Sequence, residues 1–190
     1  ADPTAIAALS QGITTIVIGQ DGSSDPVDSL KRRIERRPAS INIATYTGHA
    51  SLREQVMKDV YRKSDTAEIA RMKILLAAEL AKGSLGLSSG LEYEEGFYAT
   101  RDEMIGLASV AARHGGRYIS HIRSEDINIE RAVEEIIDIG KQAKLPVQIS
   151  HLKIAMRSKW GTSRDIIKRL EVARAEGVDI TADVYPYSLW

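Results

Sequence analysis

The chain has 190 residues, 43% of them hydrophobic and 27% charged, which favours one globular domain covering residues 1–190. Its 26 basic and 26 acidic residues give a formal charge of zero, so no broad electric field would attract nucleic acid or an anionic membrane. A small molecule is therefore the expected partner. Without cysteine, the chain has neither disulfides nor thiolate metal sites. The apolar runs are too short to span a bilayer and no signal-peptide pattern opens the sequence. Because we expect the native N-terminus with any targeting signal to be missing, the location stays unknown, with the cytoplasm as the default.

Short β-rich runs alternate along the chain with longer stretches whose apolar residues recur every three or four positions. In chain order, the predicted strands cover residues 13–19, 41–47, 84–89, 117–122, 147–152 and 178–185. Helices are predicted after the second, third and fourth strands. Their apolar stripes are Ile69, Met72, Leu76 and Leu80; Met104, Leu107, Ala108 and Ala111; and Ile129, Val133, Ile136 and Ile137.

Capping residues predict where several helices begin and end. Ser51 with Glu54, and Thr100 with Glu103, have the spacing of a capping box. Glycines at positions 83, 115, 116 and 177 fall where helices should stop. The basic run 31–37, interrupted by Ile34 and Glu35, is interpreted as a solvated helix face rather than a nucleic-acid surface.

Repeated strand–helix units of about 30 residues require parallel strands with right-handed crossovers. Polar residues at the C-terminal ends of many strands favour a barrel over a doubly wound sheet, and no glycine-rich phosphate fingerprint follows the first strand. The predicted fold is thus an α/β, partial (β/α)8 TIM barrel. Because a complete barrel has eight strands and about 250 residues, we expect the sequence to be a fragment.

Two histidines end neighbouring predicted strands in the same sequence context, Ile119-Ser120-His121-Ile122 and Ile149-Ser150-His151-Leu152. Parallel neighbours lie about 4.8 Å apart, so two imidazoles at matching heights can bind one metal ion, and neutral imidazole suits Zn²⁺. Strand alternation puts each histidine on the same face as the isoleucine two residues before it, which we expect to be the inner face. A pair of hydrogen-bonded core histidines is the alternative interpretation.

Six motifs extend this pattern over essentially the whole chain. They cover residues 12–19, 48–53, 86–93, 118–125, 151–153 and 183–187. In this order they resemble the strand ends of the N-acyl-D-amino-acid deacylases (D-aminoacylases) of the metal-dependent amidohydrolase superfamily. The resemblance implies strands two to seven of the barrel, with His121 on the fifth and His151 on the sixth, and one or two bound zinc ions.

The resemblance also implies a reaction and its contacts. The expected reaction is hydrolysis of the amide bond of N-acyl-D-amino acids, which releases a carboxylate and a D-amino acid. Lys153 would face the substrate carboxylate, because its ammonium is a compact positive charge. Tyr93 would face the scissile carbonyl, because a phenol can donate to the oxygen as charge builds on it. Arg123 would either contact substrate or, preferably, pair with Glu125. Tyr185 is assigned to the pocket wall.

The third metal ligand stays open at this point. Many family members carry Asn-Cys-Gly after the second strand, where this chain has Gln20-Asp21-Gly22. The Asp21 carboxylate can replace a thiolate, although Asp-Gly-Ser-Ser equally predicts a turn. Some amidohydrolases use a carboxylated lysine after the fourth strand, but that position falls in Leu87-Ser88-Ser89-Gly90. This leaves Asp21 or, as the less favoured choice, Glu92.

Two parts of the superfamily's machinery are missing from the sequence. The His-x-His motif of the first strand does not occur in the chain, and the general-base aspartate of the eighth strand would lie after the last residue. We therefore expect this chain alone not to be fully active. The alternatives are another amidohydrolase reaction, on a dihydroorotase- or hydantoinase-type cyclic amide or on a dipeptide, and a catalytically inactive scaffold.

Three further residues have weaker assignments. His49, at the end of the third strand, is interpreted as a helix cap or, with less weight, as a residue of the site. His114 lies at a helix end, where a cation suits the helix dipole. Asp183, near the end of the last predicted strand, is a possible partner for a metal ligand.

Overall fold

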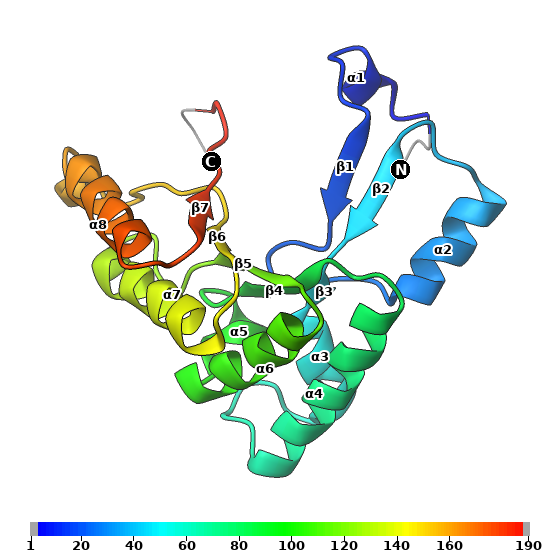
Figure 1. The fold of residues 1–190 in the computed structure, drawn as a ribbon, viewed down its shortest axis with the longest axis horizontal. Helices are drawn as coiled ribbons and strands as arrows, with labels where there is room; N and C mark the ends of the chain where they lie inside the picture. Colours follow the sequence, from blue (N-terminus) through cyan, green and yellow to red (C-terminus); the bar gives the residue numbers. More distant parts are fainter. Residues whose placement is uncertain (1–3, 188–190) are drawn as a thin grey trace.

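The structure is a computed structural model that describes residues 4–187 as alternating strands and helices (Figure 1). In chain order, the elements are α1 (Ile6–Leu9), β1 (Thr15–Ile18), α2 (Val27–Arg36), β2 (Asn42–Thr45), β3 (Thr47–Gly48), α3 (His49–Val56), α4 (Thr66–Ala81), β4 (Gly86–Gly90), α5 (Glu94–Phe97), α6 (Arg101–Arg113), β5 (Arg117–His121), α7 (Ile129–Ala143), β6 (Val147–Ile149), η1 (Arg157–Lys159), α8 (Ser163–Ala175) and β7 (Ile180–Ala182).

Every strand pair in the described chain is parallel, and each strand lies beside its neighbour in sequence. β1 pairs with β2, and β3, β4, β5, β6 and β7 form one sheet in that order. Helical crossovers connect the strands of the larger sheet. This is the strand order of a barrel wall, as the sequence predicts, because parallel neighbours need such crossovers.

The predicted strand at 41–47 is in fact two strands, β2 and β3, that meet at Tyr46. The Tyr46 amide still donates to the Ile18 carbonyl of β1, whereas the Thr45 carbonyl already accepts from the Leu85 amide before β4. The chain therefore changes hydrogen-bonding partner at this point. Glycine is required nearby, because a Cβ on Gly48 would lie 2.3 Å from the Gly22 carbonyl oxygen.

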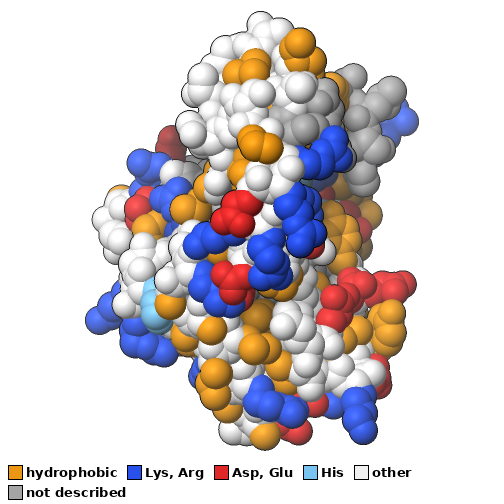
Figure 2. Space-filling model, turned by 90° about the vertical axis from the view of Figure 1, so that its right-hand side faces the viewer, with side chains coloured by type: hydrophobic (Ala, Val, Ile, Leu, Met, Phe, Trp, Pro, Cys, Tyr) orange, Lys and Arg blue, Asp and Glu red, His pale blue; other side chains and the backbone are white. Residues whose placement is uncertain are grey.

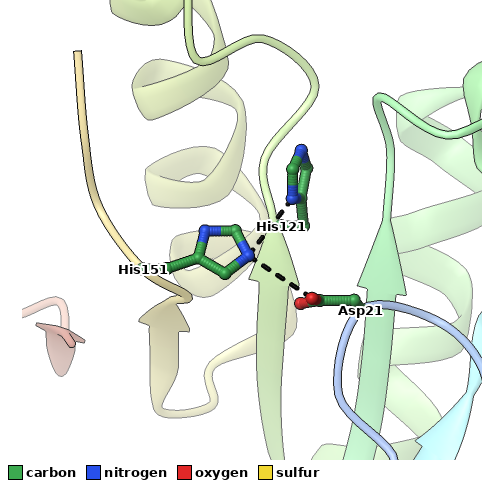
Figure 3. Close-up of side chains that lie close together, drawn as sticks. All are labelled: Asp21, His121 and His151. Atoms are coloured by element: carbon green, nitrogen blue, oxygen red, sulfur yellow. Dashed lines mark hydrogen bonds and ion pairs between the residues drawn. The ribbon is translucent and has the colours of Figure 1, made fainter. Parts of the chain in front are cut away.

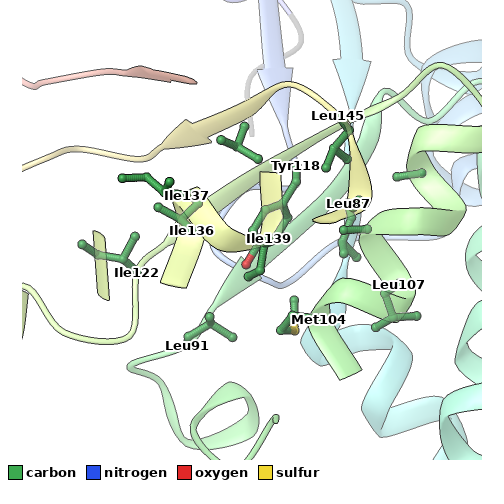
Figure 4. Packing of buried hydrophobic residues seen from close by; sticks show 14 of the residues in the cluster. Leu87, Leu91, Met104, Leu107, Tyr118, Ile122, Ile136, Ile137, Ile139 and Leu145 are labelled. Carbon is green, nitrogen blue, oxygen red and sulfur yellow. The ribbon is translucent and has the colours of Figure 1, made fainter. Parts of the chain in front are cut away.

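Helices α4, α6 and α7 cover one face of the larger sheet and form the main hydrophobic core. The three predicted apolar stripes supply most of its helical side, and Leu87 and Tyr118 meet them from β4 and β5 (Figure 4). Tyr118 is fully buried, and burial raises the pKa of its phenol to about 12. Full burial of each such side chain contributes about 1.5–3 kcal/mol, so this layer holds the strands in register.

The cap predictions are confirmed only in part. Thr100 accepts from the Glu103 amide at 3.2 Å and begins α6, but the Glu103 side chain does not turn back to complete the box. The prediction for Ser51 and Glu54 is wrong, since α3 begins at His49 and the Ser51 hydroxyl instead hydrogen bonds to Ser24. A complete capping box starts α4, formed by Asp65 and Glu68.

The opposite face of the sheet lines a cavity of about 860 Å³. Ile119 and Gln148 face it from β5 and β6, while Tyr118 and Val147 pack among the helices. This alternation is the period of two expected for strands. Asp21, His151 and Tyr185 lie among the lining residues, so the cavity reaches the end of the sheet where the predicted site residues lie.

The basic run occupies α2 and the residue after it. Arg33 pairs with Asp25 at 2.7 Å, and both side chains are more than half exposed. The side of the molecule seen in Figure 2 shows Lys and Arg side chains with Asp and Glu among them. Mixed signs on an exposed helix agree with the predicted solvated face. None of the helices within residues 4–187 is both long and apolar enough to cross a membrane.

A buried polar cluster joins α3 to α6. Glu103 accepts from Arg53 at 2.8 and 3.0 Å, from Ser64 at 2.7 Å, and bonds to His49 Nε2 at 2.9 Å. His49, Arg53 and Glu103 have no exposed side-chain surface. His49 is thus neither a side-chain cap nor a neighbour of the predicted site, which corrects both interpretations. Its ring instead fixes α3 against α6.

We expect this cluster to make the fold sensitive to acid. Burial lowers the pKa of His49 below 6.5, so its stabilisation is present above pH 6.5 and declines as the pH falls below that value. Burial opposes ionisation of Glu103, but bonds from His49, Ser64 and Arg53 outweigh it and hold its pKa at about 2. Its stabilisation is present above pH 4.5 and is lost as the pH falls toward 2.

Urea unfolding at pH 7.5, 6, 4.5 and 3 measures this dependence. The free energy of unfolding should decrease at each step, and His49→Gln should flatten the step between pH 7.5 and 6. His114→Gln is the control, since His114 is exposed at the end of α6, where a cation suits the helix dipole, and its replacement should not flatten that step. Equal stability at pH 7.5 and 4.5 would contradict the expectation.

Candidate metal centre

Three potential metal ligands converge from separate parts of the sheet (Figure 3). Asp21 follows β1, His121 is the last residue of β5, and His151 lies in the turn after β6. His121 Nδ1 is 3.2 Å from His151 Nε2, which is 3.4 Å from Asp21 Oδ2. The three ligand atoms all lie within 4.8 Å of one another. The structure therefore brings together all three residues predicted as ligands.

His151 reaches this position by a route that strand alternation did not predict. Ile149 packs in the helix-side core, so the expectation that His151 shares its face is wrong. β6 ends at Ile149, and His151 has a left-handed backbone with φ +37°, which turns its ring toward the cavity. Asp183 holds this turn, because its Oδ1 accepts from the His151 amide at 2.6 Å.

Each histidine contacts a glutamate on the side away from the other ring. His121 Nε2 lies 3.0 Å from Glu92 Oε2, and His151 Nδ1 lies 2.9 Å from Glu125 Oε1. An ionised carboxylate only accepts hydrogen bonds, so these outer nitrogens carry the N–H groups. The inner nitrogens, His121 Nδ1 and His151 Nε2, then turn their lone pairs toward each other and toward Asp21.

This arrangement suits a cation. Asp21 Oδ1 is buried without a hydrogen-bond partner among residues 4–187, an unfavourable state for a carboxylate oxygen. Two nitrogens bound at about 2.0–2.1 Å to a tetrahedral zinc lie about 3.3 Å apart, close to the separation of the inner nitrogens. Two imidazoles and one carboxylate are also a common donor set for zinc. The residues present therefore fit the metal that the sequence predicts.

Three predicted substrate contacts surround the same point. Tyr93 Oη lies 3.0 Å from His121 Nδ1, and partial burial together with the Asp21 charge raises the pKa of its phenol. Lys153 forms an ion pair with Glu125 and lies 5.4 Å from the centre of the Tyr185 ring. The Tyr185 ring is in turn 6.2 Å from the His151 ring. Tyr93, Lys153 and Tyr185 thus all lie beside the histidine pair.

Arg123 has a different position from the one predicted. Its guanidinium binds Glu135 of α7 at 2.8 and 2.9 Å and donates to the Phe97 and Ala99 carbonyls. The expected partner Glu125 is therefore wrong, whereas the preference for a structural ion pair is confirmed. These contacts commit Arg123 to the helix side of the sheet and leave it no contact with the ligands or with Tyr93.

The two glutamates beside the histidines are the residues that sequence reasoning missed or misplaced. Glu92 was considered as a third ligand, but it lies on the side of His121 away from His151 and groups with Glu125. Glu125 was considered only as a partner of Arg123. The sequence does contain a signal for Glu125, because this acidic residue lies four positions after the predicted ligand His121.

Several known proteins are similar to this chain in sequence. The chain is 36% identical over 203 residues to the D-aminoacylase of Alcaligenes xylosoxydans xylosoxydans, an alignment covering 94% of this chain and 42% of that protein. It is 34% identical over 201 residues to the N-acyl-D-glutamate deacylase of the same organism, covering 94% and 41%. Over most of its length the chain is therefore similar to N-acyl-D-amino-acid deacylases. It spans about two-fifths of the length of these deacylases, and no protein-family profile matches it.

Solved deacylase structures share the fold. The N-acyl-D-glutamate deacylase of Bordetella bronchiseptica, complexed with zinc and a phosphonate inhibitor, superposes with a TM-score of 0.91 and 35% identity over 94% of this chain and 43% of that one. An L-hydantoinase of Arthrobacter aurescens aligns with a TM-score of 0.62 at 13% identity, which shows a common fold alone. These likenesses confirm the predicted partial amidohydrolase barrel.

Proposed function

We propose that this chain supplies zinc ligands and substrate contacts for hydrolysis of N-acyl-D-amino acids to a carboxylate and a D-amino acid. The observation that carries the proposal is the convergence of Asp21, His121 and His151, with the buried and unpartnered Asp21 Oδ1 among them. The relatives support it, since the deacylases that match are named for this substrate class. Within the product of the complete gene, residues 1–190 would belong to one catalytic barrel domain.

In the proposed mechanism, His121 Nδ1, His151 Nε2 and Asp21 would hold the zinc. Zinc bound there would lower the pKa of a water toward about 7 and polarise the amide carbonyl. The Tyr93 phenol, kept protonated by its raised pKa, would donate to the carbonyl oxygen as negative charge develops on it. Lys153 would orient the substrate through its carboxylate, and Tyr185 would bound the pocket.

An activity assay on the product of the complete gene tests this function. The substrates are N-acetyl-D- and N-acetyl-L-amino acids with acidic and apolar side chains, a dihydropyrimidine and a dipeptide. We expect amine release from the D-acyl substrates alone, loss of that activity on chelation, and recovery with added zinc. Turnover of only the cyclic amide or dipeptide would assign a different amidohydrolase reaction, and zinc binding without any turnover would favour a scaffold.

Tyr93→Phe provides a sharper test of the mechanism. Loss of one donor to a developing oxyanion lowers kcat by about 10²–10³-fold, and the zinc content should not change because Tyr93 is not proposed as a ligand. Tyr98→Phe is the matched control, because Tyr98 is an exposed tyrosine at the other end of α5. A variant Tyr93→Phe with wild-type kcat would remove the phenol from the proposed mechanism.

A further inference from the structure

Glu125 makes contacts with both kinds of residue that the proposed function uses. Its Oε1 lies 2.9 Å from His151 Nδ1, and its Oε2 forms the ion pair with Lys153 Nζ. Only 5% of the Glu125 side-chain surface is exposed. A buried carboxylate is stable where both oxygens have partners, and here one partner is a proposed metal ligand and the other a proposed substrate contact.

The hydrogen on the His151 ring is the critical feature. A neutral imidazole has one N–H and one lone pair, and the partner of one nitrogen decides which role the other takes. Lys153 Nζ also lies 2.9 Å from His151 Nδ1, and an ammonium can only donate. If Lys153 donated to Nδ1, the ring hydrogen would move to Nε2 and face Asp21, and zinc could bind Nε2 only after that hydrogen had left it.

We propose that Glu125 is a positioning residue that keeps the hydrogen of His151 on Nδ1. One carboxylate oxygen accepts that N–H while the other holds the Lys153 ammonium, so Lys153 does not compete for Nδ1. His151 Nε2 is then left with its lone pair toward His121 and Asp21. This inference rests on the proposed function, because that function makes His151 a zinc ligand and Lys153 a substrate contact. Glu125 would position both residues.

Glu125 differs from Glu92 in its burial and in the histidine that it contacts, because Glu92 contacts His121. The Glu92 side chain is 35% exposed and contacts only His121 among the three proposed ligands, so water can replace much of its interaction. Glu125 is buried in the middle of the loop, residues 122–128, that follows β5, and its carbonyl accepts from the Ala155 amide at 2.7 Å. This backbone bond fixes Glu125 against the segment that carries Lys153.

Two measurements on the product of the complete gene test the proposal. In the metal-free protein labelled with ¹⁵N-histidine, long-range ¹H–¹⁵N spectra at pH 8 should show His151 as the Nδ1–H tautomer. Glu125→Gln should shift His151 toward the Nε2–H tautomer and raise the Kd for zinc by about 10–100-fold, as expected when the partner of a metal ligand is lost. The zinc affinity is measured by competition with a chelating dye.

Glu135→Gln is the matched control. Glu135 is also a buried glutamate in an ion pair, but its partner Arg123 lies on the helix side of the sheet. It should retain the wild-type spectrum and zinc Kd. The proposal is overturned if His151 of the wild-type protein is the Nε2–H tautomer, or if Glu125→Gln binds zinc within twofold of wild type. If the wild-type protein binds no zinc, the proposed function fails, and the spectra still decide the role of Glu125.

Discussion

Replacing either His121 or His151 with alanine will remove bound zinc and lower the deacylase rate by about a thousandfold, which equals a loss of about 4 kcal/mol of transition-state stabilisation. The reason is the small number of ligands, since the described chain offers two imidazoles and one carboxylate at this point. Loss of one histidine leaves one imidazole and one carboxylate to hold the zinc. Metal-ion catalysis supplies several kcal/mol of charge stabilisation, so its loss accounts for an effect of this size.

Elemental analysis of the dialysed product of the complete gene measures zinc per chain, and single-substrate kinetics measures the rate. His114→Ala is the control, because it removes an exposed imidazole at the end of α6, before the start of β5, whereas His121 is the last residue of that strand. This control should retain both zinc and activity. One full equivalent of zinc in both His121→Ala and His151→Ala would refute the assignment of the site.

Glu103→Ala is expected to lower the free energy of unfolding by about 3–5 kcal/mol, the usual cost of breaking a buried ion pair from one side. Arg53 has no exposed surface and would keep only the Val60 and Arg62 carbonyls as partners for its charge. The loss exceeds that for an exposed pair because water cannot solvate the guanidinium that remains.

Urea denaturation at pH 7.5 measures this change, and zinc content should stay at the wild-type level because Glu103 is not near the ligands. Asp25→Ala breaks the exposed pair with Arg33 and serves as the control, with an expected loss of at most about 1 kcal/mol. A loss of less than 1 kcal/mol for Glu103→Ala would show that α3 and α6 do not depend on this charge pair.

Much of the fold could be predicted from the sequence, because apolar periodicity reports which face of an element is buried. The stripes on α4, α6 and α7 became the core as expected. The division of β2 from β3 could not be predicted, since Tyr46 continues the apolar run and only the hydrogen bonds change. The helix start at His49 was missed for a similar reason, because Ser51 has a capping spacing but bonds to Ser24.

The residues of the candidate site could likewise be predicted only in part. His121 and His151 were predicted because they end neighbouring strands, which meet at one edge of a parallel sheet. Asp21, Tyr93 and Lys153 were predicted from the resemblance to the deacylases. The partners of Glu125 and Arg123 were not found, because alternation applies only while a strand continues. β5 ends at His121, so residues beyond it take directions set by the loop, and Arg123 turns to α7 while Glu125 turns to His151.

Asp21 and His151 share one further property, a left-handed backbone with φ +57° and +37°. An L-residue other than glycine adopts this conformation at a cost of about 1–2 kcal/mol, which is smaller for aspartate and asparagine, so two of the three proposed ligands occupy positions where glycine would be less strained. Gene copies released from selection for activity would gain thermal stability by acquiring glycine there. Such copies would lose the site first and keep the barrel wall, so the residues at positions 21 and 151 distinguish an active lineage from an inactive one of the same fold.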